Sequence, residues 1–282
     1  MSVFDLHSHS NLSDGELSPT ALVARAKSKG VDYLALTDHD TFSGMAEAKK
    51  AAAEEKIQLI TGVEVSAVWN KLEIHIVGLD FQSDDQCFAG HLQKQCDARW
   101  QRAEKIALKL EQRGIPGTFE EAQEMAEGQV IGRPIFAQIL VNRGVVKDRA
   151  QAFKKYLKVG KPAYVMTDWV SMEESIEWIH QAGGLAVLAH PGRYPISKTK
   201  LRSLITAFKS FGGDALEVST ATHKPTDIDI LARLSCDNEL YSSQGSDFHL
   251  PESHWAELGK FPPLPKICEP IWMKRNWHQR VE

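Results

Sequence analysis

Two histidines lie two residues apart in the segment DLHSHSNLSDG, which covers residues 5–15. If this segment is a β-strand, the alternation of side chains places His7 and His9 on the same face. Two imidazoles on one face are suited to binding one metal ion. A single H-x-H pair is a weak signal, because exposed or hydrogen-bonded histidine pairs have the same spacing. Other parts of the chain must supply further ligands.

Further histidines and carboxylates recur where short apolar runs end, in LTDHD, GVEVS, EIHIVGL, LAHPGRY and QGSDFH. Together with His7 and His9, six of the eleven histidines belong to this set. Imidazole and carboxylate ligands without thiolate suit manganese, iron or zinc, and a carboxylate can bridge two ions that together bind a phosphoryl group. The candidate metal ligands are His7, His9, His39, Glu64, His75, His190, Asp247 and His249.

The elements that must position these residues follow an alternating pattern. Seven apolar runs of the strand type are VFDLHSH, DYLALTDHD, IQLITGVEVS, EIHIVGLDF, GLAVLAHP, DALEVST and ELYSSQGSDFH. Helical patterns separate several of them, and Ser171 with Glu174 predicts a capping box at the start of one helix. Strands alternating with helices predict a parallel sheet. We therefore expect an α/β fold, a distorted seven-stranded (β/α)7 barrel whose strand ends meet at one rim.

The alternation stops between about residues 88 and 161, where the runs become helical. Ala103, Ile106, Ala107 and Leu110 have helical spacing, and no strand candidate interrupts the segment. We predict a barrel formed by residues 1–87 and 162–282 and an all-helical insertion at 88–161 that caps the active site. From 91 to 161 there are 14 Lys and Arg against 8 Asp and Glu, although the whole chain has a net charge of −4. This local excess of positive charge favours a polyanionic ligand.

Composition excludes several protein classes. The chain has 282 residues, of which 43% are hydrophobic and 25% charged, as in ordinary globular proteins. No apolar run is long enough to span a bilayer, and the first residues lack the basic and apolar regions of a signal peptide. We therefore expect a cytoplasmic protein without membrane contact. The four cysteines have no C-x-x-C spacing, which indicates reduced thiols.

Taken together and in order, these motifs resemble those of the polymerase and histidinol phosphatase (PHP) family. The resemblance implies a distorted seven-stranded barrel with up to three divalent metals, manganese before iron or zinc. It implies one site formed by His7, His9, Glu64 and Asp247, and a second that shares Glu64 and adds His75 and His190. Asp14, His39 and His249 would hold the third metal.

The helical insertion and the phrases AFKKYL, GKPAYV and AVLAHPGRY resemble a narrower branch of the family. That branch contains 3',5'-nucleotide bisphosphate phosphatases and the 5'-to-3' exoribonuclease RNase AM. The resemblance implies hydrolysis of the phosphate bond on the 3' side of a 5'-phosphorylated nucleotide, in short RNA or in a bisphosphate. No obligate protein partner is implied. A small-molecule phosphatase, such as a histidinol phosphatase, is the enzymatic alternative, and a non-catalytic metal-binding module is the alternative of another class.

Several further residues have expected roles. Arg133 in IGRP and Arg193 in HPGRY are candidates for binding the 5'-phosphate, since a guanidinium binds phosphate with two hydrogen bonds. His223 is a candidate substrate contact. Asp5 and Asp40 flank the ligands and are expected to orient imidazoles. One position departs from the branch: the residue after IGRP is commonly histidine, but here it is Ile135.

Overall fold

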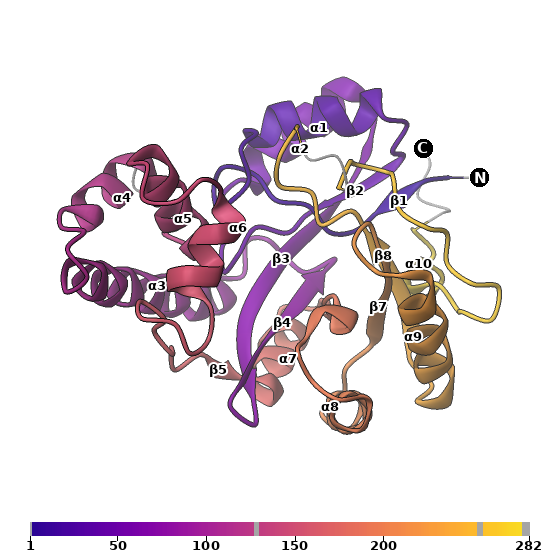
Figure 1. The fold of residues 1–282 in the computed structure, drawn as a ribbon. Coiled ribbons are helices and arrows are strands. Elements are labelled where there is room, and N and C mark those ends of the chain that lie inside the picture. Colours follow the sequence, from indigo (N-terminus) through magenta and orange to yellow (C-terminus); the bar gives the residue numbers. More distant parts are fainter. Residues whose placement is uncertain (1, 127–129, 253–255, 278–282) are drawn as a thin grey trace.

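The computed structural model describes residues 2–126, 130–252 and 256–277 and has an α/β fold (Figure 1). The strands are β1 (Phe4–Asp5), β2 (Tyr33–Leu36), β3 (Gln58–Trp69), β4 (Leu72–Leu79), β5 (Val170–Ser171), β6 (Leu185–Leu188), β7 (Ala215–Thr220) and β8 (Tyr241–Gly245). The helices are α1 (Pro19–Ser28), α2 (Met45–Glu55), α3 (Gln86–Glu111), α4 (Thr118–Ala126), α5 (Arg133–Asn142), α6 (Arg149–Ala152), α7 (Met172–Gln181), α8 (Lys198–Ser210), α9 (Pro225–Asp237) and α10 (Ile271–Lys274). Short π and 3-10 helices cover Phe153–Leu157 and Pro191–Arg193.

Seven strands form a nearly closed barrel, as predicted. They are hydrogen-bonded in the order β1-β2-β3-β4-β6-β7-β8, and the short β5 pairs with β3 outside this path. The two end strands meet, because the backbone N–H of Leu6 donates to the carbonyl oxygen of Gln244 at 3.1 Å. The side-chain amide of Gln244 donates in turn to the carbonyl oxygen of Phe4 at 3.0 Å. The distorted seven-stranded barrel expected from the sequence is therefore confirmed.

The expectation of a wholly parallel sheet is wrong at β4, which runs antiparallel to both β3 and β6. Only Asn70 and Lys71 join β3 to β4, and both have positive φ, at 47° and 63°. A two-residue turn of this kind makes a hairpin, since a parallel connection needs a dozen or more residues. Because β4 is reversed, its start lies at the rim where the other strands end, and His75 reaches that rim from near the start of β4.

Helices surround the barrel except where the insertion lies (Figure 1). In that view α1 and α2 lie above the strands, α7 and α8 below them and α9 on the right. The helix α7 begins with the predicted capping box, in which Ser171 and Glu174 exchange hydrogen bonds. At the C-terminus, Ile271 and Trp277 are fully buried and pack in the same apolar cluster as Phe4 and Val187. The described part of the C-terminal segment therefore belongs to the barrel core.

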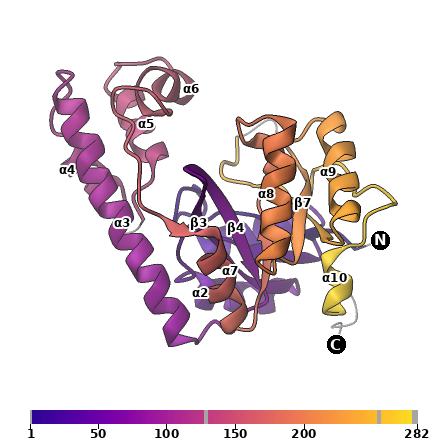
Figure 2. The ribbon, with the colours of Figure 1, turned by 90° about the horizontal axis from the view of Figure 1, so that it is seen from below.

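The insertion has an apolar core of its own. The predicted helical face of α3, including Ala103, Ile106 and Leu110, is buried against α4, α5 and the turn at 153–157. Near the other end of α3, Phe88 and Leu92 pack in the core of the barrel. One helix thus enters two cores and fixes the insertion beside the barrel (Figure 2). The helical elements run from Gln86 to Leu157, while the boundaries at 88 and 161 stay a prediction.

Candidate metal centre and substrate cavity

The nine predicted ligands converge at one rim of the barrel. Loops after β1, β2, β6 and β8 carry most of them, whereas Glu64 belongs to β3 and His75 to β4. His7, His9 and Glu64 are at most 1% exposed, so they meet beneath the surface. The full set is His7, His9, Asp14, His39, Glu64, His75, His190, Asp247 and His249.

Four ligand atoms form one compact group at the bottom of the site. His7 Nε2 and His9 Nε2 are 3.1 Å apart. Each lies 3.3 Å from Glu64 Oε2, and Asp247 Oδ1 is 3.5 Å from His7 and 3.4 Å from His9. Neighbouring ligands on one divalent ion are about 3.0–3.4 Å apart, since metal–ligand bonds are about 2.1 Å long. These distances match neighbouring ligands on one ion, and the ligand atoms of His7, His9 and Glu64 all lie within 4.8 Å of one another.

The second oxygen of Glu64 faces another group. Glu64 Oε1 lies 2.9 Å from His75 Nδ1 and 3.0 Å from His190 Nε2. Its Oε2 is also 3.1 Å from His39 Nδ1. The carboxylate thus contacts different imidazoles through its two oxygens, which is the arrangement of a bridging ligand.

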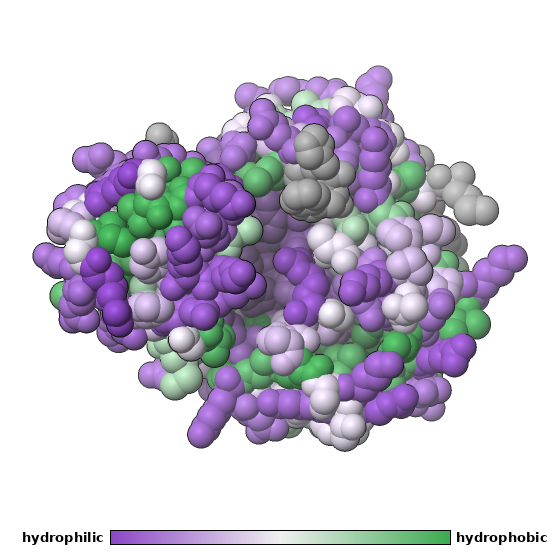
Figure 3. All heavy atoms as spheres, in the orientation of Figure 1, coloured by the Kyte–Doolittle hydropathy of each residue, from purple (hydrophilic) through white to green (hydrophobic). Residues whose placement is uncertain are grey.

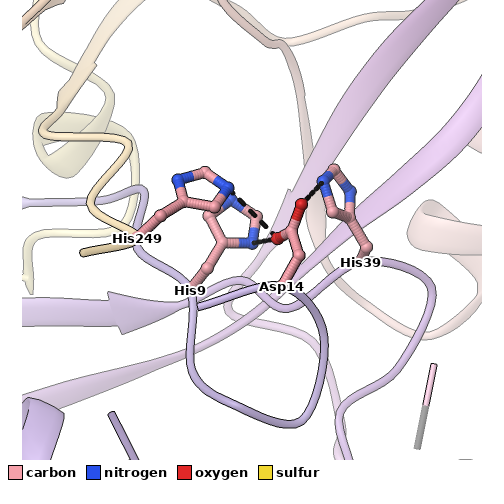
Figure 4. Close-up of side chains that lie close together, drawn as sticks. All are labelled: His9, Asp14, His39 and His249. Carbon is pink, nitrogen blue, oxygen red and sulfur yellow. Dashed lines mark ion pairs between the residues drawn. The ribbon is translucent and has the colours of Figure 1, made fainter. Parts of the chain in front are cut away.

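A third group surrounds Asp14 (Figure 4). Its carboxylate oxygens lie 3.1 Å from His249 Nε2, 3.7 Å from His39 Nε2 and 3.8 Å from His9 Nδ1. One ligand atom from each of these four residues falls within 4.8 Å of the others. The structure thus adds His9 to the predicted trio and links this group to the first one, since the two nitrogens of His9 face different groups.

The electrostatics of the site fit bound cations. Burial would raise the pKa of Asp14, Glu64 and Asp247, but the surrounding basic side chains outweigh it and hold all three pKa values low. For His9, burial is likewise outweighed, and the neighbouring carboxylates raise its pKa to about 10.

Other imidazoles are held in the neutral form. Burial lowers the pKa of His39 and of His190. His39 Nδ1, His190 Nδ1 and Asp14 Oδ1 are buried without a well-formed hydrogen bond. Neutral imidazole nitrogens and carboxylate oxygens with unused lone pairs are the donors that a divalent metal takes. The residues present therefore fit a metal cluster.

The backbone is strained at this rim. His190, Asp247 and Asp40 have φ values of 31°, 53° and 54°. Such positive φ values are uncommon for residues other than glycine and cluster at functional sites, where the surrounding structure maintains them. Two of these three residues, His190 and Asp247, are candidate ligands, so the uncommon backbone conformations coincide with the candidate metal centre.

The sequence analysis did not identify Glu217, which contacts the His7 imidazole and the backbone of His190. Glu217, in the otherwise apolar strand β7, is 2% exposed. Its Oε1 accepts from His7 Nδ1 at 2.9 Å, and its Oε2 accepts from the backbone N–H of His190 at 2.6 Å. A glutamate within a buried strand was the available signal, because a buried carboxylate needs partners.

The predicted role of Asp5 and Asp40 needs correction. Asp5 accepts hydrogen bonds from the backbone N–H groups of Ser246 and Gly259, and Asp40 accepts from Ser66 N–H and Arg99 Nε. No hydrogen bond joins either carboxylate to an imidazole ring among the described residues. Both carboxylates are fully buried. Asp5 ties the first strand to the segment before Asp247, and Asp40 ties its loop to β3 and α3.

A cavity of about 750 Å³ opens above the ligands. Figure 3 shows it as a hollow with hydrophilic walls between the insertion and the barrel. Both predicted phosphate-binding residues, Arg133 and Arg193, line it. His223 does not: it is buried, its Nδ1 lies 3.0 Å from the carbonyl oxygen of Val218, and the structure does not bring it to the cavity. Other cavity-lining residues include Glu73, Arg99, Arg102, Arg149, Phe153 and Tyr194.

On the cavity wall, two arginines share one carboxylate. Arg102 Nη1 and Arg133 Nη2 lie 3.2 Å and 3.3 Å from the two oxygens of Glu73. Burial opposes ionisation of Glu73, but the two guanidinium groups lower its pKa to about 2. The Nε of Arg102 is buried without a hydrogen-bond partner. Two positive charges facing one negative charge leave an excess that suits an anion.

Comparisons with known proteins agree with this geometry. A barrel with imidazole and carboxylate ligands at one rim defines a class of metal-dependent hydrolases. The sequence profile of the PHP domain matches residues 5–114. A 3',5'-nucleoside bisphosphate phosphatase from Chromobacterium violaceum is 42% identical over 96% of this chain and 96% of its own length. The 5'-3' exoribonuclease Rnm of Escherichia coli is 44% identical over 98% of this chain and 94% of its own length.

A solved structure shares the whole fold. An amidohydrolase from Chromobacterium violaceum, with bound sulfate and no metal, superposes with a TM-score of 0.92 at 41% identity and covers 98% of this chain and 96% of its own. The chain belongs to the PHP family. It is a hydrolase of the phosphoesterase class that uses divalent metals. No helix within the described residues is both long and apolar enough to cross a membrane, and all four cysteines are free.

Proposed function

We propose that this protein hydrolyses the phosphate bond on the 3' side of a 5'-phosphorylated nucleotide. Its substrates would be 3',5'-nucleotide bisphosphates and the 5' end of short RNA. The observation that carries the proposal is the pairing, in one cavity, of a cluster of metal-type ligands with a separate excess of arginine charge. A substrate with two phosphates could then bind both parts at once.

At the floor of the cavity, nine residues would hold three divalent ions, with manganese the first choice. The ligand sets would be His7, His9, Glu64 and Asp247; Glu64, His75 and His190; and Asp14, His39 and His249. Bound ions of this kind supply an activated water and neutralise charge on the phosphoryl oxygens. Glu217 would hold His7 in the ring orientation that metal binding needs.

At the wall, Arg102 and Arg133 would bind the 5'-phosphate, and Arg193 would contact the substrate nearer the floor. Phe153 offers a partly buried ring on which the base can stack. Hydrolysis would break the bond between the phosphorus and the 3' oxygen, so the released mononucleotide keeps a 3'-hydroxyl. The shortened RNA then begins with a new 5'-phosphate and is again a substrate.

Product analysis tests the proposal directly. Manganese-loaded protein should release mononucleotides stepwise from RNA with a 5'-monophosphate, act poorly on RNA with a 5'-hydroxyl, and convert adenosine 3',5'-bisphosphate to AMP and phosphate. Asp14→Ala should abolish all turnover without unfolding the protein, and Asp84→Ala, at an exposed carboxylate of the α3 entry loop, is the matched control. Turnover of histidinol phosphate alone would replace the proposal with a small-molecule phosphatase, and absence of any turnover would favour a metal-binding module.

A further inference from the structure

A second cavity of about 470 Å³ adjoins the first one. It lies between the loop at 11–16, which carries Asp14, and the helices α4, α5 and α6 of the insertion. Asp14, Pro134 and Arg149 line both cavities, so the two adjoin at the Asp14 end of the ligand cluster. Nothing in the hydrolysis of a mononucleotide requires this space.

The helix α5 separates the two cavities. Arg133, at its first position, lines the first cavity, whereas Ile135 and Gln138 line the second. Ile135 offers an apolar side chain to the second cavity. The 5'-phosphate anchor and the second cavity therefore lie on different sides of one helix.

The walls of the second cavity combine apolar and hydrogen-bonding groups. Met125, Val130 and Ile135 form an apolar wall, and the side-chain amides of Asn11 and Gln138 line the cavity. The Gln138 amide also donates to Asn142 and accepts from Arg149. An apolar surface with a few amides is suited to a nucleobase, which stacks through its face and forms hydrogen bonds along its edge.

Arg149 stands where the cavities join. Its Nε donates to Gln138 Oε1 at 2.6 Å, and its Nη2 lies 3.5 Å from the exposed carboxylate of Glu16. Exposed ion pairs of this length contribute little, so the guanidinium can exchange Glu16 for a phosphate at small cost. A cation at this junction suits the charged linkage between two nucleotides.

We propose that the second cavity binds the nucleotide that follows the scissile phosphate of an RNA chain. This inference rests on the proposed function. Arg149 would contact the sugar–phosphate backbone at the junction, and the wall of Met125, Val130 and Ile135 would cover the base. A bisphosphate ends at the scissile phosphate and leaves this cavity empty. The second cavity would therefore distinguish RNA from bisphosphate substrates.

Charge variants at Met125 test the inference. Met125 is 41% exposed near the end of α4, and the exposed Leu108 occupies a comparable place on α3 but lines neither cavity. With manganese-loaded protein and non-cleavable analogues in which a methylene group replaces the scissile 3' oxygen, Met125→Glu should weaken binding of the 5'-phosphorylated RNA dinucleotide about tenfold relative to adenosine 3',5'-bisphosphate. Met125→Lys should shift the same ratio the other way, and Leu108→Glu should shift neither ligand.

Two results would overturn the inference. In the first, each Met125 variant changes the affinities for the dinucleotide and for the bisphosphate by the same factor. In the second, the wild-type protein binds the dinucleotide no more tightly than the bisphosphate. Measuring hydrolysis of both substrates by the manganese-loaded protein distinguishes failure of this inference from failure of the proposed function. Bisphosphate and RNA hydrolysis without any dependence on Met125 would refute only the second cavity. Selective dinucleotide binding without turnover of either substrate would refute only the phosphoesterase assignment of these substrates.

Discussion

Replacement of Glu217 by glutamine tests the architecture beneath the ligands. The wild-type carboxylate accepts two hydrogen bonds, from His7 Nδ1 at 2.9 Å and from the backbone N–H of His190 at 2.6 Å. Glutamine keeps one acceptor oxygen and replaces the other with an NH₂ group. Either His7 Nδ1–H or the His190 backbone N–H must then face this NH₂ group, which is itself a donor, and lose its hydrogen bond.

The structure sets the size of the effect. Loss of one buried hydrogen bond to a charged group costs about 1.5–3 kcal/mol. Since both partners belong to the candidate ligands His7 and His190, we expect much of this cost to appear as manganese affinity reduced about 10–100-fold. Metal titration by calorimetry measures this, with urea unfolding of the metal-free protein reporting how much of the cost falls on the fold.

Glu177→Gln, on the exposed face of α7, is the matched control and should bind metal like the wild type. The reasoning would be refuted if Glu217→Gln bound manganese with wild-type affinity and stoichiometry. If Glu217→Gln lowered the free energy of unfolding of the metal-free protein by the full cost and left metal affinity unchanged, Glu217 would stabilise the fold without affecting metal binding.

Three further predictions concern the cavity wall, the apolar core at the base of the barrel and the stability of the protein in acid. Arg133→Ala should raise KM about 10–100-fold for 5'-phosphorylated substrates, through loss of a charged hydrogen bond, and change hydrolysis of 5'-hydroxyl RNA little; an equal effect on both would contradict the assigned anchor. Trp277→Ala should lower the free energy of unfolding by about 3–5 kcal/mol in urea titrations, since this fully buried ring fills the barrel base, whereas Met273→Ala at an exposed neighbour should not. Burial would raise the pKa of Asp214, but hydrogen bonds from His180, Lys274 and the Ala186 N–H lower it. The stability from Asp214 is therefore complete above its unfolded pKa of about 3.9 and lost as pH falls through the folded pKa, so Asp214→Asn should destabilise the protein more at pH 7 than at about pH 3, and an equal effect at both would contradict this.

The sequence predicted the seven barrel strands and the residues that gather at their rim because both depend on local patterns. Apolar runs of strand length mark the seven barrel strands. The H-x-H pair marks His7 and His9 as candidate ligands, although both lie in the loop after β1 and not in a strand. The capping box at Ser171 and Glu174 depends on residues three apart, and the structure contains it. Chemically unusual residues at strand ends likewise stand out without knowledge of the fold.

Tertiary structure alone decided the partners of those residues. The reversal of β4 depends on its pairing with β6 as well as on the turn at Asn70 and Lys71, and periodicity carries no strand direction. Asp5 and Asp40 were expected to orient imidazoles because they adjoin ligands in sequence, yet Glu217, more than two hundred residues from His7, has that position. Likewise Arg102 meets Glu73, and Ile135 lines the second cavity, through packing of the insertion on the barrel. Sequence spacing fixes which side chains share a face of one element, whereas contacts between distant elements depend on how the whole chain packs.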